Sequence, residues 1–274
     1  MEIKFKNVSY VIDNELILNN INMSLKKNKI NGIIGNNGSG KTTLVKLICF
    51  ILKPTIGTVK VGDYTNSKRS KVKRDKEISF NIAYISEDNV SINNCIKDEF
   101  KDILKEYNYK YELVNKRSSD TLELVGLDKS YLNRNYDSLS STEKYFINIA
   151  YSLILNPQVI IFDSPDMYID EYFRQKLYKL INLLKIKYKK TVIITSSNVD
   201  FIHSTCDYII AIDNGKVIKS GDKYELFTDK IINQKIGTPK TIMFSNIVRD
   251  TKGVRLEYRD KVNDLIKDIY RHVK

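Results

Sequence analysis

The stretch GNNGSGKTT, residues 35 to 43, follows the apolar run KINGIIG and precedes the helical pattern TTLVKLICFIL. It matches G-x-x-x-x-G-K-[S/T] from Gly35 to Thr42. Between a strand and a helix, such a loop turns its backbone N–H groups toward a phosphate, and the helix adds its positive end. The sequence therefore predicts a phosphate-binding loop (P-loop). Its predicted binding residues are Gly35, Asn36, Asn37, Gly38, Ser39, Gly40, Lys41, Thr42 and Thr43.

A magnesium site accompanies this loop in the sequence. A loop of this kind brings its lysine to the β- and γ-phosphates and its threonine hydroxyl to Mg²⁺, which assigns these roles to Lys41 and Thr42. A second holder of the metal belongs at the end of a neighbouring buried strand, and Asp163 closes the apolar run VIIFD (159–163). The predicted ligands are therefore ATP and Mg²⁺.

Strand and helix patterns alternate along the chain. Strands are expected at 3–12, 15–25, 29–35, 57–63, 78–86, 159–163 and 191–195, with a hairpin around an Asn-Gly turn at 209–218. Helices are expected from Lys41, across 170–188, and up to Leu155 behind a serine N-cap with Glu143 in its first turn. This alternation predicts an α/β fold with a mostly parallel sheet and an antiparallel flank.

Two regions differ from this body. Residues of about 90–155 are helical and charged, and 223–274 consist of short amphipathic segments. We expect a domain at 1–222 and a small C-terminal helical extension at 223–274. The extension is either a docking or dimerising element or a tail that packs on its own domain.

Composition narrows the class of protein. The net charge is +12, from 45 Lys+Arg against 33 Asp+Glu, which suits nucleic acid, anionic lipid or an acidic partner. Only 67–76 and 185–190 are densely basic, and we expect both to be solvated. The three cysteines are scattered without CxxC spacing, so a reducing compartment is expected. The longest apolar run, 44–52, is far short of the roughly 20 residues that span a membrane.

Three further motifs carry a resemblance to a known family. LSSTE (139–143), SPDMYID (164–170) and TVIITSSNVD (191–200) occur in the order typical of ABC transporter nucleotide-binding subunits. Residues 2–222 resemble that family as a whole, and the tail is similar to the ATPases of energy-coupling factor importers. The resemblance implies a P-loop NTPase of ABC type with a mostly parallel core sheet, an antiparallel β subdomain and a helical subdomain.

The resemblance also implies partners. In the family, two ATPase subunits enclose two nucleotides and move a transmembrane transporter subunit. This chain is accordingly expected to pair with a second ABC ATPase subunit, as a hetero- or homodimer, on the cytoplasmic face of the cell membrane. By the same resemblance, Ser140 faces a γ-phosphate held by the partner chain, and Asp170 contacts the partner at the dimer interface.

The catalytic positions depart from the family pattern. Ser164 stands where a glutamate polarises the attacking water, Ser197 where a histidine contacts the γ-phosphate, and Glu87 where a glutamine binds Mg²⁺. The aromatic residue that stacks on adenine aligns with Ile12, with Tyr10 two residues away on the same strand face. A hydroxyl is a poor general base near neutral pH, so slow or absent hydrolysis at this chain's own P-loop is predicted.

The signature motif has also changed. Ser141 and Thr142 replace two glycines, and Glu143 replaces a glutamine, which adds side chains where backbone should approach phosphate. Three functions remain open: a subunit of an energy-coupling factor importer, a non-enzymatic nucleotide-gated scaffold, and a soluble nucleic-acid-associated ATPase. The third lacks a long basic arm and interleaved aromatic and basic residues, so no nucleic-acid partner is expected.

Overall fold

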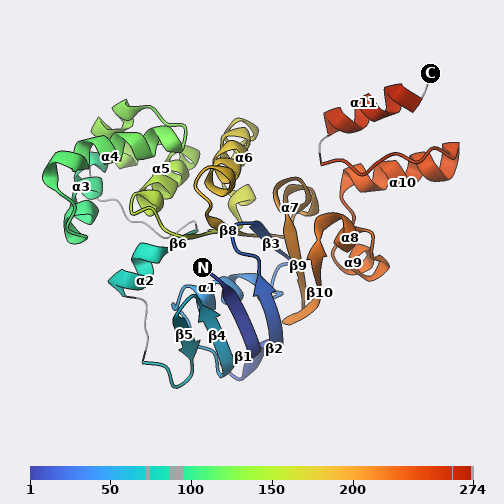
Figure 1. Ribbon diagram of the computed structural model, residues 1–274, viewed down its shortest axis with the longest axis horizontal. Helices are drawn as coiled ribbons and strands as arrows, with labels where there is room; N and C mark the ends of the chain where they lie inside the picture. The colour runs from blue at the N-terminus through green and yellow to red at the C-terminus, as the bar shows by residue number, and fades with distance from the viewer. Residues whose placement is uncertain (72–74, 87–94, 261, 273–274) are drawn as a thin grey trace.

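A computed structural model describes residues 1–71, 75–86, 95–260 and 262–272, whose strands form two sheets (Figure 1). The strands are β1 (Ile3–Ile12), β2 (Glu15–Leu25), β3 (Ile30–Ile34), β4 (Ile56–Val61), β5 (Tyr64–Ser67), β6 (Ile82–Ile85), β7 (Val159–Asp163), β8 (Thr191–Ser196), β9 (Tyr208–Asp213) and β10 (Lys216–Asp222).

The described residues also form α-helices and short 3₁₀ turns. The α-helices are α1 (Lys41–Ile48), α2 (Lys76–Asn81), α3 (Ile96–Glu106), α4 (Tyr111–Leu124), α5 (Ser141–Leu153), α6 (Glu171–Ile186), α7 (Val199–Thr205), α8 (Lys223–Phe227), α9 (Lys230–Lys235), α10 (Lys240–Lys252) and α11 (Val262–His272). Short 3₁₀ turns are η1 (Lys129–Asn133), η2 (Tyr136–Ser138) and η3 (Pro165–Met167).

The larger sheet has the order β10-β9-β3-β8-β7-β6. Its strands β9, β3, β8, β7 and β6 pair in parallel, while β10 is antiparallel to β9. Every residue of β3, β7 and β8 is buried, which explains their continuous apolar runs, since helices or a second sheet cover both faces of the sheet. The predicted mostly parallel sheet with an antiparallel flank is confirmed.

The smaller sheet is antiparallel, with the order β2-β1-β4-β5. The buried apolar residues form two clusters, one on each face of the larger sheet. Neighbouring residues of β3 point to opposite faces and therefore belong to different clusters. Ile33 packs with α1 and the smaller sheet, whereas Ile34 packs with the helices on the opposite face. The helix α1, which follows the P-loop, therefore lies between the two sheets.

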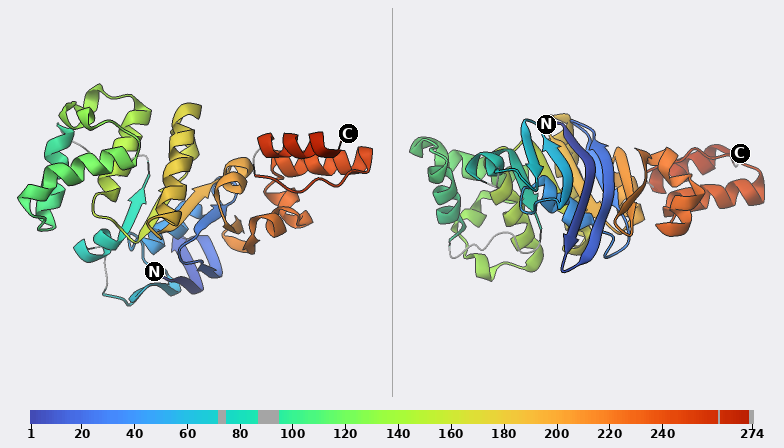
Figure 2. Two further views of the ribbon diagram at one scale, coloured as in Figure 1. Left: turned by 45° about the horizontal axis from the view of Figure 1, so that its top comes forward. Right: turned by 90° about the horizontal axis from the view of Figure 1, so that it is seen from below.

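The two helical regions lie at opposite ends of the molecule. Helices α3, α4 and α5 form one end, and α10 and α11 form the other (Figure 2). The extension is nevertheless packed into the main core where it begins. Leu226, Phe227, Ile232 and Ile242 are fully buried in the same apolar cluster as the larger sheet.

One expected strand is wrong in its first half. The segment 78–86 was expected to be extended, but residues up to Asn81 form α2 and only Ile82–Ile85 form β6. The carboxylate of Asp75 accepts a hydrogen bond from the backbone N–H of Ile78 at 3.0 Å, which caps the helix. Only Ile78 of α2 is buried, so the apolar pattern arose from a short helix with a single inward residue. The pattern also did not predict β5.

In the part of the chain that the structure describes, no helix combines the length and apolar character required to cross a bilayer.

Replacing Phe227 by alanine tests whether the extension belongs to the main core. Phe227 is fully buried, so the variant is expected to lose about 3–5 kcal/mol of unfolding free energy in urea. The control is Phe244→Ala on α10, where the ring is 42% exposed and a change within about 0.5 kcal/mol is expected. Equal losses in the two variants would contradict this packing.

Candidate nucleotide-binding site

Three parallel strands end at one edge of the larger sheet and bring the predicted site together. In the paired register, Ile34 of β3 lies beside Ser196 of β8, and Asp163 of β7 lies beside Thr195. The P-loop leaves β3 at the same edge. Ligands of open α/β sheets bind at the carboxyl ends of the strands, where the loops converge.

Two glycines of the P-loop are required by their surroundings. A Cβ atom on Gly35 would lie 2.3 Å from the carbonyl oxygen of Ile212 and 2.6 Å from the hydroxyl of Ser39, so no side chain fits there. Gly40 has φ +100°, in the left-handed region, at the N-cap of α1. The loop therefore turns tightly from β3 into α1, and α1 presents its unpaired N–H groups at the loop.

Lys41 spans the loop from inside. Its ammonium group donates to the carbonyl oxygens of Gly35 at 2.8 Å and Asn36 at 2.9 Å. Burial lowers the pKa of Lys41, while the nearby carboxylates of Asp163 and Asp166 oppose this shift. The loop carbonyls thus hold the ammonium group at the mouth of the loop, where it can neutralise a bound phosphate.

The Asp163 carboxylate is 6% exposed and is held by hydroxyl groups. Its Oδ1 accepts from Thr195 Oγ1 at 2.5 Å and from Thr42 Oγ1 at 3.3 Å. Its Oδ2 accepts from the Tyr84 hydroxyl at 2.9 Å. The structure therefore brings together the two predicted magnesium residues, Thr42 and Asp163. Their oxygens are the hard donors that Mg²⁺ prefers, so these residues fit the metal.

The segment after Asp163 has an unusual backbone. Ser164 has φ 53° and ψ 49°, a left-handed conformation that is rare for serine, and its N–H lies within hydrogen-bond distance of both the carbonyl and the hydroxyl of Thr195. Burial raises the pKa of the Asp166 carboxyl, while Ser196, Arg174 and Lys41 oppose this shift. Oδ1 of Asp166 has no hydrogen-bond partner within the described residues. A carboxylate thus lies close to the Lys41 charge, three residues beyond Asp163.

Ser197 follows the end of β8 and is exposed. Asn198 donates its backbone N–H to Ser196 Oγ at 2.9 Å and caps α7 with its own side chain. The predicted residue Glu87 lies outside the described residues. Ser164 and Ser197, which the sequence predicts to be altered catalytic positions, therefore both lie at the strand ends beside the P-loop.

The extension reaches this site directly. The side-chain amide of Asn36 donates to the carbonyl of Lys235 at 3.1 Å, across 199 positions of sequence. Lys235 forms an ion pair of 2.8 Å with Asp213 at the end of β9. The carboxylate of Asp200, just after β8, accepts from the backbone N–H of Lys240 at 2.7 Å and so caps α10. Residues 235–240 thus bridge the P-loop and the segment after β8.

The signature serine is bound within its own helix. Ser140 is the N-cap of α5 and forms a capping box with Glu143, as the predicted N-cap serine and Glu143 in the first turn indicated. The hydroxyl and the N–H of Ser140 both donate to Glu143 Oε2, at 2.8 and 2.9 Å. The Tyr131 hydroxyl, the Ser140 groups and Arg134 lower the pKa of Glu143, so it stays ionised at neutral pH. A negative charge therefore lies at the hydroxyl expected to face a γ-phosphate.

The remaining predicted residues lie on exposed or peripheral positions. Asp170 is exposed and caps α6 by accepting from Phe173 N at 2.9 Å. Tyr10 packs partly against the core and pairs with Leu18, whose side chain lies against Gly40. Ile12 is 47% exposed. The role of either residue toward a base remains a prediction.

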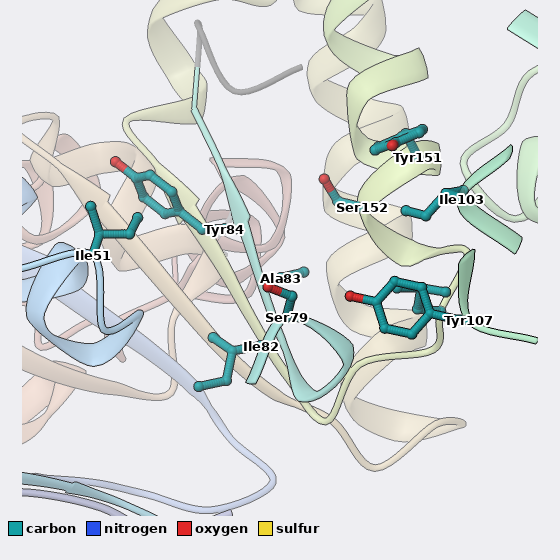
Figure 3. Close-up of a pocket in the computed structure, with 10 residues that line it drawn as sticks. Ile51, Ser79, Ile82, Ala83, Tyr84, Ile103, Tyr107, Tyr151 and Ser152 are labelled. Atoms are coloured by element: carbon teal, nitrogen blue, oxygen red, sulfur yellow. The ribbon is translucent and has the colours of Figure 1, made fainter. Parts of the chain in front are cut away.

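A cavity of about 240 Å³ lies beside β6, the edge strand of the larger sheet. Figure 3 shows Tyr84 and Ile51 on one side of the strand and Tyr107 and Tyr151 on the other. We call this cavity the β6 groove. Its lining joins the end of α1 to the helical region of α3 and α5.

Sequence patterns alone did not identify several residues of the site. Thr195 is a polar residue inside an apolar run, a signal that was available. Tyr84 gave no local signal, since its partner Asp163 is 79 positions away. The Asn36 contact to the extension is equally non-local. Asp166 lies in the motif SPDMYID, but no role was predicted for it.

Comparison with known proteins agrees with this geometry. A family model described as ABC transporter matches residues 18–167, more than half of the chain. The energy-coupling factor transporter ATP-binding protein EcfA2 of Spiroplasma kunkelii is 29% identical over 254 residues, which cover 86% of this chain and 80% of that protein. The corresponding EcfA1 of Mycoplasma mobile is 30% identical over 252 residues and 90% of each chain.

Solved structures show the same fold. CbiO1 of Clostridium perfringens, part of the ABC transporter complex CbiONQ, superposes with a TM-score of 0.74 at 24% identity over 85% of this chain and 95% of that one. A dimeric ATP-binding cassette bound to ADP and phosphate gives a TM-score of 0.70 at 24% identity, over 81% of this chain and 98% of that one. The α/β fold of P-loop NTPases of ABC type, expected from the sequence, is confirmed.

Replacing Asp166 by asparagine is expected to stabilise the protein. The pKa of the folded carboxyl is raised, so the ionised form costs stability above that pKa, and the cost disappears as pH falls through it. The free energy of unfolding should rise by about 1 kcal/mol at pH 7 and change little near about pH 4.

Urea unfolding at the two pH values measures both differences. Asp128→Asn is the control, since hydrogen bonds from Ser130 lower the pKa of that exposed carboxyl and its replacement should not raise stability. A lower stability of Asp166→Asn at pH 7 would contradict the cost assigned to the buried charge.

Proposed function

The chain belongs to the ABC transporter family, and from this premise we propose that it is the ATP-binding subunit of an energy-coupling factor importer with impaired hydrolysis at its own P-loop. The relatives at 29% and 30% identity, which are named as ATP-binding proteins of such transporters, support this assignment. In this proposal, residues 1–222 form the nucleotide-binding domain, about 90–155 its helical subdomain, and 223–274 the C-terminal extension.

One observation supports the proposal: the residues predicted to bind a triphosphate lie together, while the positions predicted to activate water carry serine. Lys41, Thr42 and Asp163 converge on the P-loop through the bonds described above. Ser164 and Ser197 present hydroxyls where a carboxylate and an imidazole are required. Loss of a positioned general base typically slows a reaction by about 10²- to 10⁴-fold.

Each retained residue has a binding role. The Lys41 charge would neutralise the β- and γ-phosphates, the α1 N–H groups would bind phosphate oxygens, and Thr42 with Asp163 would hold Mg²⁺. When bound, Mg²⁺ supplies charge neutralisation between the phosphates and the protein. The predicted base-stacking position is Tyr10 or Ile12 at the edge of the smaller sheet.

The surface predicted to face the partner's nucleotide is altered as well. The Ser140 hydroxyl donates its proton to the ionised Glu143 carboxylate, and this negative charge would repel the negative charge of an approaching triphosphate. A partner's nucleotide would therefore bind here only if Glu143 moved or its charge were offset by Arg134, which lies 3.7 Å away. This observation favours a second candidate, a nucleotide-gated scaffold subunit without catalysis.

The proposed partners are a second ABC ATPase subunit, in a hetero- or homodimer, and a transmembrane transporter subunit. CbiO1, which has the same fold, is described as part of a transporter complex. With no helix among the described residues able to cross a bilayer, attachment to the cytoplasmic face of the membrane would depend on that transmembrane partner. The exposed Asp170 would lie at the ATPase interface.

Lys41→Ala is expected to weaken Mg-ATP binding by at least about 10-fold, because hydrogen bonds to a charged group contribute about 1.5–3 kcal/mol. Isothermal calorimetry on the isolated chain measures this, with Lys46→Ala on the same helix as the control. The wild-type chain should show saturable binding with little phosphate release. Absence of binding by the folded wild-type chain would refute the proposed function.

The double variant Ser164→Glu with Ser197→His is expected to raise phosphate release by about 10²-fold or more, since it restores a carboxylate and an imidazole at the strand ends. Steady-state phosphate release from the purified assembly measures the gain, with Lys41→Ala added as the inactive control. If turnover stays at the wild-type level while Mg-ATP still binds, the scaffold function is favoured and the missing base is not the limit.

A further inference from the structure

The Asp163 carboxylate is fixed from both neighbouring strands. Tyr84 on β6 donates to Oδ2 at 2.9 Å, and Thr195 on β8 donates to Oδ1 at 2.5 Å. The third donor, Thr42, is more distant at 3.3 Å. One hydrogen bond from a strand to each oxygen fixes the plane of the carboxylate, and both donors belong to strands rather than to loops.

The Tyr84 and Thr195 hydroxyls both donate their protons to the Asp163 carboxylate. Thr195 Oγ1 accepts from the backbone N–H of Ser164 at 3.0 Å, so its single proton is directed to the carboxylate. The Tyr84 hydroxyl likewise has one proton, and it donates that proton to Oδ2 of Asp163 at 2.9 Å. Both of these bonds are separate from the contact between Thr42 and the carboxylate.

We propose that Tyr84 and Thr195 are positioning residues that hold Asp163 in the orientation in which it binds Mg²⁺ beside the nucleotide. This inference rests on the proposed function. In this proposal, each residue acts through the carboxylate of Asp163 rather than on the nucleotide. Outer residues that orient a metal-binding group typically contribute about 10- to 100-fold to metal affinity.

Tyr84 also lines the β6 groove. Its ring lines the β6 groove next to Ile51, while its hydroxyl points away from Tyr107 and Tyr151 (Figure 3). The same side chain therefore touches the groove with its ring and the magnesium carboxylate with its oxygen. Phenylalanine is the appropriate substitution for Tyr84, because it keeps the ring that lines the groove and removes only the hydroxyl that binds Asp163.

The test separates metal affinity from nucleotide affinity. Tyr84→Phe and Thr195→Val are compared with wild type in calorimetric titrations of ATP with excess EDTA and of ATP at increasing Mg²⁺. The Mg²⁺ concentration at half-saturation should rise by about 10- to 100-fold in each variant, while ATP affinity in EDTA stays unchanged. Thr195→Ser keeps the hydroxyl and should restore the wild-type Mg²⁺ dependence.

Tyr178→Phe is the matched control, because it also removes a partly buried tyrosine hydroxyl. Tyr178 lies on α6, and its hydroxyl forms a hydrogen bond of 3.0 Å with Ser204 on α7 rather than with Asp163. Tyr178→Phe should leave the Mg²⁺ dependence unchanged. Circular dichroism checks that each variant is folded. If Thr195→Val does not fold, Tyr84→Phe alone decides the test. A Tyr84→Phe chain with the wild-type Mg²⁺ dependence overturns the inference alone, whereas a wild-type chain that binds no nucleotide overturns the proposed function as well.

Discussion

The close approach of Gly35 to the backbone of β9 is the contact on which the site depends. A side chain at this position would collide with the Ile212 carbonyl, so the chain leaves β3 pressed against its neighbouring strand. This close packing at Gly35 sets the direction in which the P-loop leaves β3, and so determines where α1 begins. The positions of Lys41 and Thr42 relative to Asp163 follow from it, since α1 lies between the two sheets and cannot shift independently.

The site divides into a retained half and an altered half. Phosphate and metal binding rely on the backbone of the P-loop and on residues at the ends of buried strands, where packing fixes their geometry. Ser164 and Ser197, the positions predicted to have lost water-activating groups, lie just beyond the strands β7 and β8. Residues beyond the strand ends can change without loss of the fold, which is compatible with the proposed combination of nucleotide binding and impaired hydrolysis.

Local patterns predicted the elements whose signal is local. The P-loop, the buried strands ending in Asp163 and Thr195, and the Asn-Gly hairpin follow from spacing and turn chemistry, and the structure contains them. The start of β6 was wrong because a capped helix of six residues with one buried side chain resembles a strand in sequence. Tyr84 and the Asn36 contact could not be predicted, because both depend on partners brought close only by the complete fold.

The hydrogen bond from Asn36 to the Lys235 carbonyl connects the extension to the P-loop. Its first helices are embedded in the main core, and the bridge at 235–240 ties it to the phosphate loop and to the segment after β8. Helices α10 and α11 project from this attachment at one end of the molecule (Figure 2). The attachment of these helices is therefore shared between the apolar core and the phosphate loop, and the bond at Asn36 would register a displacement of either.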